Sequence, residues 1–159
     1  MNITIRNAVQ ADNMKIRPLQ EQIARLHHEG RPDLFKTEPR FHSEENFAKM
    51  LADPEHSIFI AEDETGRVVG YAFAFVMHIR NHPSYIDFDR FYIDDICVLE
   101  DCRRMGIGKR LFVECRKKAE ETGCMVMDLG VFGFNKDAIA FYEACGMTEQ
   151  QRRMEISLR

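Results

Sequence analysis

The stretch from Asp94 to Lys109, which reads D-D-I-C-V-L-E-D-C-R-R-M-G-I-G-K, constrains the fold more than any other part of the chain. Its apolar run from Ile96 to Leu99 predicts a strand. A short polar loop follows, and a helical pattern of apolar residues begins near Gly106. This order places the end of a strand beside the start of a helix, with a basic loop between them.

The start of this helix is a predicted anion site. The first backbone amides of a helix have no partner within it, and the helix dipole adds partial positive charge there. Gly106 and Gly108 lack a Cβ, so an anion can approach the backbone closely, and arginines can add charge-assisted hydrogen bonds. The simpler alternative is a turn whose glycines serve only steric needs. The candidate binding residues are Arg103, Arg104, Met105, Gly106, Ile107, Gly108 and Lys109.

A second motif lies between Asn135 and Met147 and reads N-K-D-A-I-A-F-Y-E-A-C-G-M. Asn135 can cap a helix, and Gly146 can end it. Tyr142 lies within this helix, and taken alone it is either a half-buried core aromatic or a functional phenol.

Together the two motifs resemble the GNAT family (GCN5-related N-acetyltransferases). R-x-x-G-x-G after a strand ending in V-L is similar to the family's acyl-CoA loop, and neither a Walker nor a Rossmann loop fits the spacing. The second motif resembles N-x-x-A-x-x-F-Y-x-x-x-G-F, with Met147 replacing the usual phenylalanine. The resemblance is strongest over residues 90 to 150. It implies an α/β (mixed α+β) acyl-CoA N-acyltransferase fold, with a central mixed, largely antiparallel sheet flanked by helices on both faces.

The resemblance also implies an activity and a donor. It implies an N-acetyltransferase that moves an acetyl group from acetyl-CoA to a primary amine, by direct attack in a ternary complex. The pantetheine arm would bond to the backbone of Ile96, Cys97 and Val98, and the pyrophosphate would lie on the amides from Arg104 to Lys109. Asn135 and Tyr142 would also contact the donor.

Direct attack requires a neutral amine, so a base is needed because alkylammonium groups have a pKa of ~10.4. Asp94 is the candidate base and Tyr142 the candidate acid for the departing thiolate. Strand alternation predicts that Asp94 and Asp95 face opposite sides of the sheet, and Asp95 is expected to have a structural partner. The short Asp94 side chain favours a water relay. Cys97 is interpreted as a packing residue, since no histidine lies nearby in sequence to activate it.

Composition excludes several other classes of protein. The 159 residues predict one domain, residues 1–159, and the net charge of −4 argues against a nucleic-acid binder. No apolar run approaches the ~20 residues of a membrane helix, so no membrane partner is expected. The six histidines show no ligand spacing, so no metal is expected. Five cysteines, an odd number, without a signal peptide predict reduced thiols and a cytoplasmic location.

The acceptor stays open between a small-molecule amine and a peptide or protein amine. A non-catalytic acyl-CoA-binding module is the third alternative. From Asp87 to Asp101 there are six acidic residues and one basic residue, which could attract a cationic amine or could form a solvated loop. A homodimer is common in the family, often through the last strands.

Local patterns predict the remaining elements. Asp12 and Ser43 are candidate helix caps, and Pro18 predicts a late start or a kink. The predicted strands are 3–9, 58–61, 68–77, 91–99, 125–131 and one or two within 147–158, and the predicted helices are 12–29, 43–53, 106–122 and 135–146.

Overall fold

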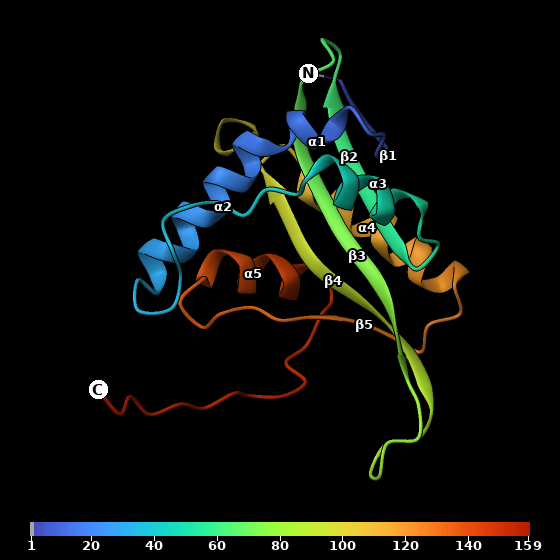
Figure 1. Ribbon diagram of the computed structural model, residues 1–159, viewed down its shortest axis with the longest axis vertical. Coiled ribbons are helices and arrows are strands. Elements are labelled where there is room, and N and C mark those ends of the chain that lie inside the picture. The colour runs from blue at the N-terminus through green and yellow to red at the C-terminus, as the bar shows by residue number, and fades with distance from the viewer. Residues whose placement is uncertain (1) are drawn as a thin grey trace.

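The computed structural model describes residues 2–159 and contains a five-stranded sheet with helices on both faces (Figure 1). The strands lie side by side in chain order, and each neighbouring pair is antiparallel except β4 and β5, which are parallel. The predicted mixed, largely antiparallel sheet is therefore confirmed. The strands are β1 (Ile3–Asn7), β2 (His56–Asp63), β3 (Val68–Ile79), β4 (Phe88–Val98) and β5 (Val126–Leu129).

The helices begin and end at recognisable signals. The predicted interruption near Pro18 is confirmed, because it lies in the first turn of a new helix. Ser43 caps its helix by accepting a bond from the Asn46 amide. The predicted cap at Asp12 is wrong, since Asp12 is the first residue of α1 and bonds Arg6 and the Val9 amide. The helices are α1 (Asp12–Lys15), α2 (Arg17–Gly30), α3 (Glu44–Ala52), α4 (Ile107–Glu121) and α5 (Lys136–Ala144), with a 3₁₀ turn η1 (Glu100–Cys102).

Two apolar cores lie on opposite faces of the sheet. We call the face covered by α1, α2 and α3 the front, and the face covered by α4 the back (Figure 1). The front core joins Leu19 and Phe47 to Tyr71 of β3. The back core joins Leu111 of α4 to Ile93 of β4. β4 contributes to both cores, with Phe91 and Ile93 in the back core and Cys97 in the front core.

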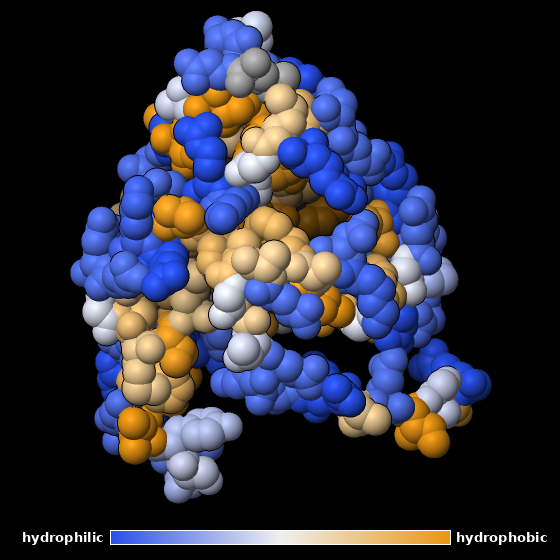
Figure 2. All heavy atoms as spheres, turned by 180° about the vertical axis from the view of Figure 1, so that it is seen from behind, coloured by the Kyte–Doolittle hydropathy of each residue, from blue (hydrophilic) through white to orange (hydrophobic). Residues whose placement is uncertain are grey.

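The C-terminal tail differs from the prediction. No strand forms from Met147 to the end of the chain. Met154, Ile156 and Leu158 are 80%, 83% and 91% exposed, and the tail stands away from the body of the molecule (Figure 2). The alternating pattern gives the tail one apolar side, but a strand also needs a neighbour, and the tail has none within the described chain.

Candidate active site

The sheet opens between β4 and β5. These two strands pair only from Arg90 to Ile93 and from Val126 to Leu129, although β4 continues to Val98. The side of β4 that faces away from β3 is therefore free of a neighbouring strand from Asp94 onward. Of the predicted pantetheine-binding residues, Ile96 and Val98 present backbone groups to this open edge, whereas Cys97 pairs with Tyr71 of β3.

The side chain of Gln22 bonds the far end of this open edge. Its Nε2 donates to the Val98 carbonyl at 3.0 Å, and its Oε1 accepts from the Glu100 amide at 3.0 Å. The intervening Leu99 amide instead bonds Val69 of β3. The groups of Val98 and Glu100 therefore point away from β3, and alternation places those of Ile96 on the same side. Sequence reasoning missed Gln22, because no local signal indicates a bond across more than seventy residues.

The basic loop after β4 has the backbone of an anion site. Arg104 and Gly106 have positive φ angles, +65° and +77°, and a positive φ is uncommon outside glycine. Gly106 leads directly into α4, whose first-turn amides have no intrahelical partner. Among residues 2–159, the amides of Arg104, Met105 and Gly106 also have no acceptor. Strained loops of this kind cluster at ligand sites.

The side chains of this loop leave positive charge free. Within the described chain, neither Arg104 nor Lys109 forms a salt bridge, and Met105 is 48% exposed. Arg103 donates to the Val98 carbonyl at 3.4 Å. Ile107 is buried, and a Cβ on Gly108 would meet the Phe141 ring at 3.3 Å. Ile107 and Gly108 therefore seat α4 against its neighbours, while the backbone and the basic side chains remain available to an anion.

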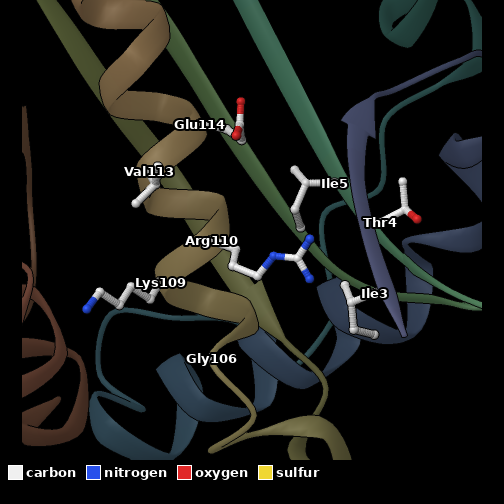
Figure 3. Close-up of a pocket in the computed structure, with 8 residues that line it drawn as sticks. All are labelled: Ile3, Thr4, Ile5, Gly106, Lys109, Arg110, Val113 and Glu114. Atoms are coloured by element: carbon white, nitrogen blue, oxygen red, sulfur yellow. The ribbon is translucent and has the colours of Figure 1, made fainter. Parts of the chain in front are cut away.

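A groove of about 670 Å³ runs along the other side of α4, against β1. Figure 3 shows Arg110 reaching toward Ile5 across this groove and Lys109 pointing away from it. Of the predicted anion-binding residues, only Gly106 and Lys109 line the groove. It is bounded by β1 rather than by the open edge of β4, so it is distinct from the predicted donor site.

A bulge at Asp94 changes the predicted directions of the two aspartates. Asp95 pairs with Phe73 and Ile93 pairs with Ala74, so Asp94 is an extra residue without a partner on β3. Ile93 packs in the back core, so alternation turns the next residue, Asp94, to the front. The bulge keeps Asp95 on the front as well, where it pairs with Phe73 and bonds Tyr71 of the front core. The prediction that they face opposite sides of the sheet is therefore wrong, because strand alternation fails at a bulge.

The two aspartates have different surroundings. Asp94 is exposed. Asp95 accepts a 2.5 Å hydrogen bond from the Tyr71 hydroxyl, which is the structural partner that was expected. Burial raises the pKa of Asp95 to about 7, with a further increase from Asp94, while the Tyr71 bond opposes the shift. A carboxyl group that titrates near neutral pH can serve as a base or as a proton store.

The second motif forms the start and body of α5, which packs against α4. The Asn135 side chain caps α5 by accepting from the Ala138 amide at 3.1 Å. About two turns after Asn135, the centre of the Tyr142 ring lies 5.1 Å from that of Phe141 and 6.5 Å from that of Phe112. Burial raises the pKa of Tyr142, and the Asp95 charge raises it further. The phenol therefore stays protonated and can donate a hydrogen bond at neutral pH.

Cys97 fits the packing interpretation. Its thiol is buried among front-core residues and contacts Gln22 and the Leu19 carbonyl. Burial raises its pKa to about 12, so the reactive thiolate is scarce at neutral pH. All five cysteines are free.

The acidic run from Asp87 to Asp101 is dispersed in the structure. Asp89 pairs with His78 and Arg80, Glu100 with Arg25, and Asp101 with Arg67. The run therefore does not form one acidic patch, and of its residues only Asp94 and Asp95 remain at the opening of the sheet.

In the described chain, no group of histidine, cysteine and carboxylate side chains could hold a metal ion. No helix in it is both long and apolar enough to cross a bilayer.

Comparisons with known proteins agree with this geometry. Residues 21–147 match the model of the acetyltransferase (GNAT) family. Over 96 residues the chain is 34% identical to L-ornithine N5-acetyltransferase NATA1 of Arabidopsis thaliana, an alignment that covers 60% of the chain and 41% of the plant protein. The chain thus spans about two fifths of the length of this curated relative.

Solved structures extend the comparison to the whole fold. A mutant of the BH1408 protein from Bacillus halodurans matches with a TM-score of 0.92 and 26% identity, covering 98% of this chain and 99% of that one. The aminoglycoside N-acetyltransferase AAC(6')-Iy, solved in complex with CoA, matches with a TM-score of 0.73 over 98% of this chain and 99% of that one. Its identity is 20%, so this second likeness concerns the fold alone.

Proposed function

The chain belongs to the acetyltransferase (GNAT) family, and we propose that it uses acetyl-CoA to acetylate a primary amine of a small molecule. The observation that carries the proposal is the open edge of β4, which runs directly into the unpartnered amides at the start of α4. An extended amide-containing arm ending in a pyrophosphate needs these two features in this order. The residues present therefore fit acetyl-CoA.

The donor would be held mainly by backbone groups. The free edge of β4 offers the amide and carbonyl of Ile96 and the amide of Val98 to a pantetheine arm, while the Val98 carbonyl is held by Gln22. The amides from Arg104 to Lys109 offer donors to the pyrophosphate. Arg103 and Arg104 add charge, and Asn135 would contact the donor from the start of α5. When bound, acetyl-CoA supplies an activated acetyl thioester. The Val98 amide would stabilise the negative charge that develops on its carbonyl oxygen.

Asp94 and Asp95 would accept the proton that the amine loses. Asp94 is exposed at the bulge, so we assign it the catalytic contact with the amine through one water molecule. Asp95 lies next to it, and burial raises its pKa to about 7. The Asp95 carboxylate can therefore bind this proton at neutral pH.

Tyr142 would complete the transfer. The amine nitrogen forms a bond to the acetyl carbon, the carbon–sulfur bond breaks, and the amine proton passes to the aspartates. The departing thiolate then accepts a hydrogen bond from the Tyr142 hydroxyl. A thiol has a pKa of ~8.5 and Tyr142 lies above the phenol value of ~10, so the proton need not transfer fully.

The small-molecule acceptor is supported by the name of the plant relative, an ornithine N5-acetyltransferase. A peptide or protein acceptor is the second candidate, and the exposed segment between β3 and β4, residues 80–87, could line a groove for it. A non-catalytic acyl-CoA-binding module is the third. A Tyr142 phenol that stays protonated, together with a carboxyl group at Asp95 that titrates near pH 7, favours catalysis over binding alone.

We also propose a cytoplasmic homodimer. The free state of all five cysteines supports a reducing compartment. The apolar side of the tail, with Met154, Ile156 and Leu158, has no partner within the described chain, and the outer edge of β5 is unpaired. Exposed strand-like segments and free edges pair readily. Light scattering should give twice the chain mass for the full chain and a lower mass after truncation at Met147.

The test of function is release of CoA thiol from acetyl-CoA at pH 8, across polyamines, aminoglycosides, amino acids and short peptides. A thermal shift with acetyl-CoA, run in parallel, reports whether the donor is bound. Turnover with one amine class supports the proposal and names the class. Stabilisation by acetyl-CoA without turnover on any amine favours the binding module, and turnover confined to peptides favours the second candidate.

A further inference from the structure

Arg90 and Asp128 form an incomplete ion pair at the point where the sheet opens. Arg90 lies on β4 and Asp128 on β5, within the short paired region that ends at Ile93 and Leu129. Asp128 lies in register with Tyr92, two residues before the bulge at Asp94. The pair is therefore next to the proposed site of acetyl transfer.

The geometry of this pair is poor for a structural salt bridge. Arg90 Nε lies 3.4 Å from Asp128 Oδ1, yet both atoms are buried and neither has a hydrogen-bond partner among residues 2–159. An arginine–carboxylate salt bridge with good geometry often makes two parallel hydrogen bonds. Burial also raises the pKa of Asp128, although Arg90 opposes the shift. Arg90 therefore balances the negative charge of the Asp128 carboxylate only in part.

The outer atoms of both side chains are available to a ligand. No hydrogen bond joins the Nη atoms of Arg90 or Oδ2 of Asp128 to any other described residue, and these atoms are not among the buried unpartnered ones. The Arg90 guanidinium lies over the Tyr92 ring, 5.2 Å from its centre, and this cation–π contact favours that position. A Cβ on Gly130 would approach the Tyr92 hydroxyl at 3.3 Å, so the glycine gives this ring space.

We propose that Arg90 and Asp128 recognise the α-carboxylate and α-ammonium groups of a diamino acid whose terminal amine is acetylated. The Nη atoms of Arg90 bind the carboxylate, since a guanidinium matches its two oxygens. Asp128 Oδ2 accepts from the ammonium group. This inference rests on the proposed transferase function and names its class of substrate.

The spacing suits a chain of three or four methylene groups. Asp128 is level with Tyr92, and two residues of strand separate Tyr92 from Asp94, which is about 7 Å. An extended diamino acid places its terminal nitrogen about 5 to 6 Å from its α-carbon. A ligand held at Asp128 therefore brings its terminal amine to the proposed proton acceptor at Asp94.

The other charged groups nearby do not offer the same recognition. Asp89 is occupied by His78 and Arg80, and the Asp87 side chain accepts from the Asn81 amide. A decarboxylated diamine would satisfy Asp128 but leave Arg90 without its anion. The Arg90–Asp128 pair therefore selects amino acids over polyamines of the same length.

The experiment compares L-ornithine and L-lysine with putrescine and cadaverine, their decarboxylated counterparts. Initial rates of CoA release give KM and kcat for the wild type, Arg90→Met, Asp128→Asn and Arg116→Met. Arg116 is an exposed helix residue paired with Glu120, so Arg116→Met controls for the loss of one positive charge. Thermal unfolding checks that each variant is folded.

We expect the wild type to prefer the diamino acids over the diamines. Arg90→Met should raise their KM at least tenfold, keep kcat close to the wild-type value, and leave the KM of the diamines unchanged. Asp128→Asn should raise the KM of both classes. L-ornithine methyl ester, which lacks the carboxylate charge, should behave toward the wild type as L-ornithine does toward Arg90→Met. Equal effects of Arg90→Met on diamino acids and diamines, or no effect, would overturn the proposal.

A calorimetric titration separates this inference from the proposed function. L-ornithine is titrated into the CoA-saturated wild type and into CoA-saturated Arg90→Met. Binding that requires Arg90 supports the recognition site even if no amine is acetylated. Acetylation of diamines without Arg90-dependent binding of L-ornithine overturns the recognition site and leaves the transferase function standing.

Discussion

The Tyr71 hydroxyl on β3 donates a 2.5 Å hydrogen bond to the carboxylate of Asp95 on β4. This bond lies next to the bulge that turns Asp94 and Asp95 toward the same face of the sheet. Burial raises the pKa of Asp95 to about 7, and the bond from Tyr71 holds it below the value that burial alone would give. Burial and the Tyr71 hydrogen bond together bring the pKa of the Asp95 carboxyl group near neutral pH.

Tyr71→Phe should move the acid limb of the pH–rate profile upward. Removing the hydroxyl removes the bond that stabilises the Asp95 carboxylate, so the pKa of Asp95 rises by roughly one unit. Because a base acts only when deprotonated, kcat/KM should then fall at a higher pH than in the wild type. Tyr85→Phe, which removes an exposed hydroxyl, is the matched control. An acid limb that stays in place or moves downward would contradict the role of Asp95.

Tyr142→Phe should slow turnover with little effect on donor binding. The phenol is the proposed hydrogen-bond donor to the thiolate, and the loss of a general acid costs about 100-fold in kcat. The KM for acetyl-CoA should change little, since the ring is retained. Steady-state kinetics with both substrates varied would measure this, and an unchanged kcat would leave Tyr142 only a packing role.

Gln22→Leu should destabilise the protein because it strips two backbone groups of their partner. The Val98 carbonyl and the Glu100 amide both bond Gln22, and a buried polar group left unpaired costs about 1 to 3 kcal/mol. For a chain of this size that loss lowers Tm by several degrees, at roughly 2 to 4 °C per kcal/mol.

Gln20→Leu is the matched control for this prediction. Gln20 is also buried on α2, but its side-chain oxygen has no partner in the described chain. Replacing Gln20 with leucine should leave Tm almost unchanged or raise it in a thermal melt. Equal losses of Tm in both variants would mean that the Gln22 bonds to β4 contribute nothing specific.

Asp12 should make the fold sensitive to acid. Burial alone would raise its pKa, but hydrogen bonds from Arg6 at 2.7 and 2.9 Å and from the Val9 amide outweigh burial and lower it. The native state then binds fewer protons than the unfolded state. This stabilisation is present above the unfolded pKa of ~3.9 and is lost as pH falls through the lower, folded value.

Urea unfolding at pH 7 and pH 3 measures this effect. Asp12→Asn should lower the free energy of unfolding at pH 7 by about 2 kcal/mol, and should flatten its decline toward pH 3. Glu143→Gln, an exposed change on α5, should leave both values near those of the wild type. A wild-type stability that rises toward pH 3 would refute the assignment.

The parts of the fold encoded in short sequence windows could be predicted. The strand, basic loop and helix around Gly106, and the cap at Asn135, depend on neighbours three or four residues away. Both motifs appear in the structure where the sequence placed them. The cofactor and catalytic roles of their residues remain predictions, since they concern a bound donor.

Features that depend on distant partners could not be predicted. The bulge at Asp94 arises from pairing with β3, and nothing in the sequence of β4 marks it. Gln22 reads as an ordinary helix residue until the fold brings β4 beside it. The tail shows the opposite case, because its alternating apolar residues predict a strand while the chain provides no neighbour for it.

Direct transfer from acetyl-CoA to an amine can be followed by mass spectrometry in two stages. The protein is mixed with acetyl-CoA alone, its intact mass is measured, and L-ornithine is then added and the products are identified. Direct transfer should give no acetylated protein at the first stage, and monoacetyl-ornithine with stoichiometric CoA at the second. A stable acetyl group on the protein before amine is added, or no acetylated amine from any acceptor of the panel, would contradict it.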